Sequence, residues 1–121
     1  MSQAPDIEIL LLEDDAAILE GLVECLELAG HRVHAVSDGA EALGWLAAGN
    51  RPRLVVLDLV MPRMGGEEFL REFRAQPGAR VPVVLMTAAS PGSVELPQVD
   101  AFLAKPFELD EFLRAVQRFL R

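Results

Sequence analysis

Acidic residues follow two of the hydrophobic runs in this sequence. Glu13 and Asp14 come directly after residues 7–12, and Asp58 comes directly after residues 54–57. Two carboxylates about 4 Å apart, at an effective dielectric constant of about 20, repel each other by roughly 4 kcal/mol. If these acids meet in the fold, they need a cation between them. An all-oxygen pocket suits Mg²⁺, or Mn²⁺, whereas Zn²⁺ is disfavoured because neither His nor Cys occupies these positions.

Two further polar residues also follow hydrophobic runs. Thr87 comes after residues 83–86, and Lys105 comes after residues 101–104. A carboxylate whose charge is partly neutralised by a metal can attack an electrophilic phosphorus, so Asp58 is a candidate phosphoacceptor. Lys105 would then offset the charge on the phosphoryl oxygens, and Thr87 would donate a hydrogen bond to one of them. The four groups together predict an aspartyl phosphate site.

Alternating strands and helices are needed to bring these groups together. Five hydrophobic runs are typical of strands: residues 7–12, 32–36, 54–57, 83–86 and 101–104. Several are nearly continuous apolar blocks, as in parallel strands covered on both faces. Between them, and after the last one, apolar residues recur with helical spacing. This order predicts a doubly wound, five-stranded parallel α/β sheet, in which ligands bind beyond the carboxyl ends of the strands.

One segment breaks the alternation. Residues 88–98 follow the fourth predicted strand and would hold the fourth crossover helix, but they contain Pro91, Gly92 and Pro97. Proline is tolerated in the first turn of a helix and not in its interior. The sequence therefore predicts a shortened or irregular fourth helix.

Length and composition limit the classes of function. The 121 residues predict one domain spanning residues 1–121, and the 19 acidic against 11 basic residues give a net charge of −8. Such a chain is repelled by nucleic acid and by anionic membranes, so neither is expected as a direct partner. The single cysteine, Cys25, cannot form an internal disulfide. Residues 9–12 are too few for a signal peptide or a membrane span. We therefore expect a cytoplasmic protein.

The sequence resembles the receiver domains of two-component response regulators, of the single-domain chemotaxis-regulator type. The matching motifs run in the family's order at nearly its spacing: Leu10-Leu11-Leu12-Glu13-Asp14, Leu57-Asp58-Leu59-Val60-Met61-Pro62 with Gly66, Leu85-Met86-Thr87-Ala88, and Lys105-Pro106-Phe107. Each motif alone is weak evidence, but the four together are specific and span almost the whole chain. The resemblance implies the flavodoxin-like strand order 2-1-3-4-5.

The resemblance also implies a role for each acidic residue. Asp58 matches the phosphoacceptor, and Glu13 and Asp14 match the acidic pair that binds Mg²⁺ together with Asp58. The backbone carbonyl of Val60 would complete the metal ligands supplied by the protein. Asp15 lies one position past the acidic pair and is not expected to be a ligand.

The remaining motif residues match the switch of the family. Thr87 resembles the switch hydroxyl, and Lys105 resembles the lysine that pairs with the phosphoryl group. Phe102 matches an aromatic residue that changes rotamer, although its position on a strand fits a plain core phenylalanine nearly as well. The Lys105–Pro106 bond matches a peptide bond that is usually cis in the family.

These likenesses imply a function as a signalling switch. A sensor histidine kinase or a phosphotransfer protein would donate the phosphoryl group to Asp58. The changed surface would then be recognised by a downstream protein target or by a covalently linked effector domain. The chain would turn over no separate substrate, so we do not expect an enzyme.

Two departures from the family pattern affect these expectations. The segment between Thr87 and Lys105 is a few residues shorter than usual, which puts the family's dimerisation and output surface in question. In addition, Val60 and Ala89 carry apolar side chains at two positions thought to tune the lifetime of the phosphoryl group. Neither can orient an attacking water molecule, so slow self-dephosphorylation is expected.

Two rival functions are weighed against this one. A phosphatase of the haloacid dehalogenase type usually carries a second Asp two residues after its nucleophile, and Val60 occupies that position here. The other rival is a pseudo-receiver that binds partners without being phosphorylated. The presence of every residue that the chemistry requires favours the phosphorylated switch.

Overall fold

Strands and helices alternate along the chain, as the sequence predicts. The computed structural model describes residues 7–76, 80–88 and 99–120. In chain order the elements are β1 (Ile9–Leu12), α1 (Ala16–Leu28), β2 (Val33–Val36), α2 (Gly39–Ala47), β3 (Leu54–Asp58), α3 (Gly66–Ala75), β4 (Val83–Thr87), β5 (Ala101–Ala104) and α4 (Leu109–Arg118). The irregular fourth helix is predicted for residues 88–98, and all of these but Ala88 lie outside the described residues.

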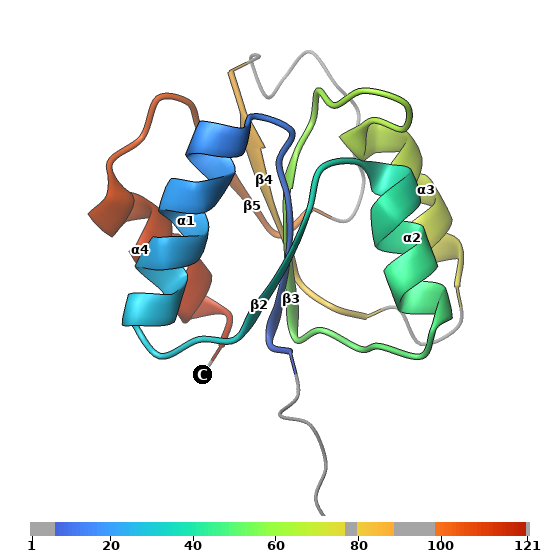
Figure 1. Cartoon of the computed structure of the whole chain (residues 1–121), viewed down its shortest axis with the longest axis horizontal. Coiled ribbons are helices and arrows are strands. Elements are labelled where there is room, and N and C mark those ends of the chain that lie inside the picture. The colour runs from blue at the N-terminus through green and yellow to red at the C-terminus, as the bar shows by residue number, and fades with distance from the viewer. Residues whose placement is uncertain (1–6, 77–79, 89–98, 121) are drawn as a thin grey trace, which may run out of the picture.

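All five strands form one parallel sheet in the order β2-β1-β3-β4-β5. This is the strand order that the family resemblance implies. Helices α1 and α4 cover one face of the sheet, and α2 and α3 cover the other (Figure 1). The expected doubly wound, flavodoxin-like α/β fold is therefore confirmed.

The central strands are hydrophobic throughout because both of their faces are covered. Every residue of β1, β3 and β4 is buried. Side chains alternate between the two faces of each strand, so the sheet divides the apolar residues into two cores. Leu10, Leu57 and Leu85 belong to the core beneath α2 and α3. Ile9 and Val56 belong to the core beneath α1 and α4, which Phe112 and Val116 help to fill.

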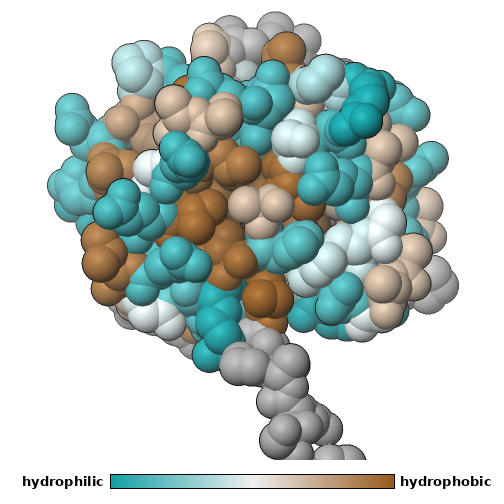
Figure 2. Space-filling model, viewed as in Figure 1, coloured by the Kyte–Doolittle hydropathy of each residue, from teal (hydrophilic) through white to brown (hydrophobic). Residues whose placement is uncertain are grey.

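The edge strands are less well covered than the central ones. Three of the four residues of β2 are only partly buried, and so is one residue of β5, in which Phe102 and Ala104 are exposed. Figure 2 shows apolar surface running over β2, between α1 and α2, with hydrophilic side chains around it. On β2, His34 stacks on Trp45 of α2 with ring centroids 4.6 Å apart, which covers part of that edge. Among the described helices, none is long and apolar enough to cross a bilayer.

Helix α3 begins in direct contact with the end of β3. A Cβ atom at Gly66 would lie 2.5 Å from the carbonyl oxygen of Asp58 and 2.5 Å from Cδ1 of Leu57. Both distances are far below van der Waals contact. Only glycine therefore lets α3 start this close to the strand that carries Asp58.

We expect Gly66→Ala to lower the free energy of unfolding by about 3 kcal/mol, because the added methyl group must displace backbone atoms. The matched control is Gly21→Ala in the middle of α1, where a Cβ would meet no atom within 4 Å. Alanine loses less conformational entropy than glycine in a helix, so this control should gain about 0.5–1 kcal/mol. Urea denaturation of both variants measures the difference. Equal stability of the two variants would contradict this packing.

Candidate functional site

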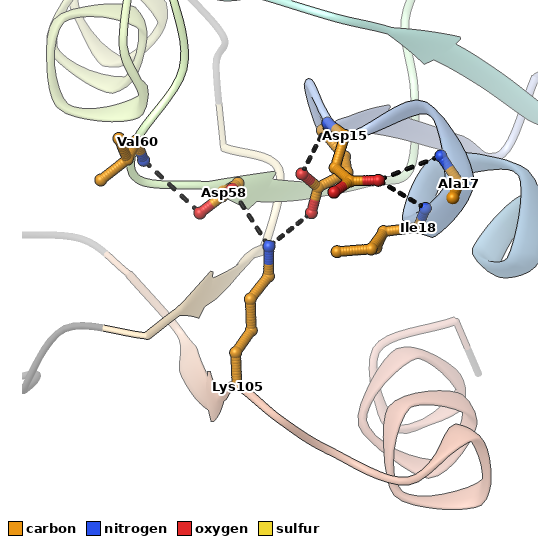
Figure 3. A network of polar contacts seen from close by, with 7 residues as sticks. Asp15, Ala17, Ile18, Asp58, Val60 and Lys105 are labelled. Atoms are coloured by element: carbon orange, nitrogen blue, oxygen red, sulfur yellow. Dashed lines mark hydrogen bonds and ion pairs between the residues drawn. The ribbon is translucent and has the colours of Figure 1, made fainter.

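Polar residues from four strands meet at the carboxyl edge of the sheet. Glu13 and Asp14 follow β1, Asp58 ends β3, Thr87 ends β4, and Lys105 follows β5. The strands are parallel and in register, with Leu12 paired to Leu57, Asp58 to Met86, and Thr87 to Ala104. Their last residues therefore lie along a single edge (Figure 3).

Three carboxylates lie close together in this site. Glu13, Asp14 and Asp58 each place a carboxylate oxygen within 4.8 Å of the other two. Glu13 is 1% exposed and Asp58 is 7% exposed, whereas Asp14 is open to solvent. Three hard oxygen donors, of which one faces solvent, match a cation such as Mg²⁺ that keeps several of its waters. The acids that the sequence singled out thus form one cluster whose chemistry fits this metal.

Lys105 contributes the positive charge at the cluster. Its Nζ donates a hydrogen bond of 2.6 Å to Oε1 of Glu13 and one of 3.1 Å to Oδ2 of Asp58 (Figure 3). Lys105 is the only lysine in the sequence. Its ammonium group lies between two carboxylates that would otherwise repel each other, so it stabilises both of them.

Burial and charge shift the pKa values of Glu13 and Lys105. Burial raises the pKa of Glu13, and the negative charge of Asp58 raises it further. The hydrogen bonds from Lys105 and from the backbone of Asp15 oppose this, but the pKa stays above its ordinary value. Burial by itself lowers the pKa of Lys105, yet the hydrogen bonds and charges of Glu13 and Asp58 outweigh it, so the net pKa is raised. Lys105 is therefore fully protonated at neutral pH.

Thr87 and Val60 lie beside the acidic cluster. Thr87 is 2% exposed, and its backbone carbonyl accepts a hydrogen bond of 2.9 Å from the N–H of Lys105. The N–H of Val60 donates a hydrogen bond of 3.4 Å to Oδ1 of Asp58. The side chain of Val60 points away from the core and is 71% exposed. The backbone of Val60 thus lies next to Asp58, and its apolar side chain faces solvent.

Other residues singled out in the sequence have different positions. The carboxylate of Asp15 accepts hydrogen bonds from the N–H groups of Ala17 and Ile18, so it caps α1 (Figure 3). Phe102 is 44% exposed, so the alternative of a plain core phenylalanine is wrong. The Lys105–Pro106 bond is cis, as the resemblance implies. Ala89, the other residue behind the expected slow dephosphorylation, lies outside the described residues.

A family model for the response regulator receiver domain matches residues 9–117 of this chain. The chain belongs to the response regulator receiver domain family. Membership implies a place in phosphorylation-dependent signalling by two-component systems. Receiver domains are signalling switches and are not generally classed as enzymes.

Similar proteins agree with this assignment. The response regulator MprA of Mycobacterium sp. strain KMS is 40% identical over 119 residues, which cover 95% of this receiver domain and 51% of that protein. MprA of Mycobacterium tuberculosis strain CDC 1551 is 37% identical over the same length. The chain therefore spans about half the length of the curated relatives that it matches.

Solved structures are also similar to this receiver domain. The receiver domain of a signal transduction histidine kinase from Syntrophus aciditrophicus matches with a TM-score of 0.84 and 34% identity, covering 93% of this chain and 89% of that one. The response regulator TrrA of Thermotoga maritima, in complex with Mg²⁺-BeF, matches with a TM-score of 0.82 and 31% identity. The latter match covers 93% of this chain and 97% of TrrA.

Replacing Lys105 with Met tests the balance of charge in this receiver domain. We expect Lys105→Met to lower the free energy of unfolding at pH 7 by about 2 kcal/mol, because the buried Glu13 carboxylate loses its cation. The folded-state pKa of Lys105 is raised above its ordinary 10.5, so its stabilising effect is complete at neutral pH. This effect is lost only as the pH rises through the raised value.

The control for this experiment is Arg114→Met, which removes one positive charge from an exposed ion pair with Asp110. This change should lower the free energy of unfolding by less than about 0.5 kcal/mol. Thermal unfolding of both variants is measured with and without MgCl₂, and a divalent cation should restore part of the loss in Lys105→Met only. If the two variants were equally stable, Lys105 would not compensate the acidic cluster.

Proposed function

We propose that this receiver domain accepts a phosphoryl group on Asp58 and changes its binding to a partner when it does so. The observation that supports this most directly is the position of the Asp58 carboxylate. It is 7% exposed, lies within 4.8 Å of two other carboxylates, and accepts a hydrogen bond of 3.1 Å from Lys105. A nearly buried carboxylate that is already paired with a cation suits a nucleophile that must carry phosphorus.

The phosphoryl donor is proposed to be a phosphohistidine on a sensor histidine kinase or on a phosphotransfer protein. A carboxylate oxygen of Asp58 forms a bond to phosphorus as the bond from phosphorus to the histidine nitrogen breaks. The bonding electron pair stays with that nitrogen. The product is an aspartyl phosphate, and the ammonium group of Lys105 pairs with its new negative charge. Each phosphorylated molecule carries one group, so the domain acts as a switch and not as an enzyme.

Mg²⁺, or Mn²⁺ in its place, is the proposed cofactor. Glu13, Asp14 and Asp58 would supply carboxylate oxygens, and Val60 would supply its backbone carbonyl. When bound, the cation would reduce the repulsion between the acids and the incoming phosphoryl oxygens. The similarity to TrrA, whose structure contains Mg²⁺-BeF, supports the proposal.

The proposed switch uses two residues beyond the acidic cluster. Thr87, which ends β4, donates a hydrogen bond from its hydroxyl group to a phosphoryl oxygen, and Phe102 turns inward on the neighbouring β5. Phe102 is 44% exposed, so the inward rotamer buries apolar surface. The face around β5 and α4 then binds either a downstream target or a linked effector domain. A cytoplasmic location is part of this proposal, because the proposed phosphoryl donor is a kinase or a phosphotransfer protein of a signalling system.

Phosphorylation by a small phosphodonor tests the proposal. Incubation with acetyl phosphate and Mg²⁺, followed by intact mass spectrometry, should give a single phosphoryl adduct. The adduct should be absent in Asp58→Asn and strongly reduced when EDTA removes the metal. No adduct on the unaltered chain would favour a pseudo-receiver. Sustained release of free phosphate from diverse substrates would favour a phosphatase.

Two neighbouring acids provide a matched test of the metal site. Asp14→Asn should weaken Mg²⁺ binding about tenfold or more, equivalent to about 1.4 kcal/mol, because it removes a charge from the cluster. Asp15→Asn removes the same charge one residue further on, but Asp15 caps α1 and asparagine caps equally well. Its Mg²⁺ affinity, measured by isothermal titration calorimetry, should stay within about twofold of the original. Equal losses in both variants would show a general effect of charge and no ligand at Asp14.

A further inference from the structure

The loop from β3 to α3 begins at the proposed phosphoacceptor and is closed at its base. Leu59 follows Asp58, and its carbonyl accepts a hydrogen bond of 2.9 Å from the N–H of Gly66. Val60, whose carbonyl is a proposed metal ligand, lies inside this loop. The position of that carbonyl therefore depends on what holds the remainder of the loop.

An ion pair fixes the far side of the loop. Arg63 donates a hydrogen bond from Nη2 to Oδ2 of Asp38, which lies at the end of the segment from β2 to α2. The carboxylate of Asp38 is fully buried and also accepts a hydrogen bond of 2.8 Å from the N–H of Glu41, so it caps α2. That backbone hydrogen bond and the Arg63 charge keep the pKa of Asp38 below its ordinary value, against the effect of burial. Asp38 is thus a charged, buried anchor.

Met64, the residue after Arg63, attaches the loop from β3 to α3 a second time to the start of α2. The carbonyl of Met64 accepts a hydrogen bond of 2.9 Å from the N–H of Gly39. The Met64 side chain lies so close that a Cβ at Gly39 would be 2.8 Å from its Cγ. Two consecutive loop residues therefore bind the first turn of α2.

The backbone of Arg63 is held in an unfavourable conformation. Its φ of 61° makes it the only residue other than glycine with a positive φ among the described parts of the chain. For an ordinary side chain this conformation costs about 1–2 kcal/mol. The side chain is itself 72% exposed, so core packing does not explain the cost. Its ion pair with Asp38 is the side-chain contact that can offset this cost.

We propose that Arg63 and Asp38 are positioning residues for the metal site, and we call their ion pair the loop clamp. This proposal rests on the Mg²⁺ site of the proposed function. The clamp fixes the peptide three residues before Arg63, and with it the position of the Val60 carbonyl. Without it, Arg63 relaxes toward an ordinary φ and the loop shifts at Val60. Residues that orient metal ligands typically change metal affinity roughly 10–100-fold when they are lost.

The direction of the change in Mg²⁺ affinity distinguishes the loop clamp from a simple effect of charge. Removing a positive charge from the protein should, by Coulomb's law alone, strengthen the binding of a cation. The clamp predicts the opposite for Arg63→Gln, namely Mg²⁺ affinity that falls roughly tenfold. The matched control is Arg71→Gln, which removes an equally exposed arginine that pairs with Glu67 on α3. It should leave the affinity unchanged or slightly higher.

Two further variants identify the part of the clamp that matters. Arg63→Gly accepts the positive φ without strain but is not held there, because it cannot pair with Asp38 and glycine populates positive and negative φ about equally. It should therefore also lose affinity. Asp38→Asn keeps the cap on α2 while it weakens the ion pair. If the pair acts as one unit, the double variant Arg63→Gln with Asp38→Asn should lose no more affinity than either single variant. Isothermal titration calorimetry with MgCl₂ measures each affinity, and circular dichroism verifies that each variant is folded.

The outcomes distinguish the clamp from the function on which it rests. If the unaltered protein binds Mg²⁺ and Arg63→Gly binds it equally well, the clamp is wrong and the proposed metal site stands. If the unaltered protein binds no Mg²⁺, both proposals fail. If Arg63→Gln does not fold, Arg63→Gly and Asp38→Asn decide the question. Glycine tolerates the positive φ at position 63, and asparagine keeps the cap on α2. At saturating Mg²⁺ the clamp variants should recover phosphorylation by acetyl phosphate, which a damaged nucleophile would not.

Discussion

Repulsion between carboxylates is the constraint on which this site depends. Glu13 and Asp58 are almost fully buried, and Asp14 lies beside them, so the sheet edge concentrates negative charge where water is scarce. Lys105 keeps this arrangement folded by donating hydrogen bonds to both buried acids. Its pairing with Glu13 is the shorter of the two, at 2.6 Å. The hydrogen bond to Asp58, the proposed phosphoacceptor, is the longer one, at 3.1 Å.

The two cores position the site from opposite faces of the sheet. Side chains of the central strands alternate between the core beneath α1 and α4 and the core beneath α2 and α3. Packing on both faces thus fixes the ends of β1 and β3 without help from the polar contacts of the site. The loop clamp adds a third restraint beyond the sheet, where regular hydrogen bonding between strands has ended. Rigid strands thus supply the side chains of the site, and a pinned loop supplies its proposed backbone ligand.

The sequence predicted the elements and the composition of the site because both depend on local patterns. Continuous apolar blocks indicated the buried strands, and the polar residue after each block marked its end. The strand order came from the family motifs and not from periodicity. The pairing of Arg63 with Asp38 could not be predicted in this way, because it joins two loops far apart in the sequence and neither follows a periodic pattern. Aspartate is a common residue at helix N-caps, but that preference does not identify the arginine that pairs with Asp38. The sequence also left open whether Phe102 is a switch residue or a plain core phenylalanine, because its position on a strand fits both.

Using the chain's single lysine as the counter-ion of the site has a further chemical consequence. An amine can be acylated only in its neutral form, and reactive lysines are those whose pKa is lowered. Lys105 has a raised pKa because its carboxylate partners stabilise the ammonium form. The ion pairs that balance the acidic cluster therefore also make this side chain less reactive toward electrophilic acyl donors. The contacts that hold the site together thus also lower the reactivity of the chain's one lysine.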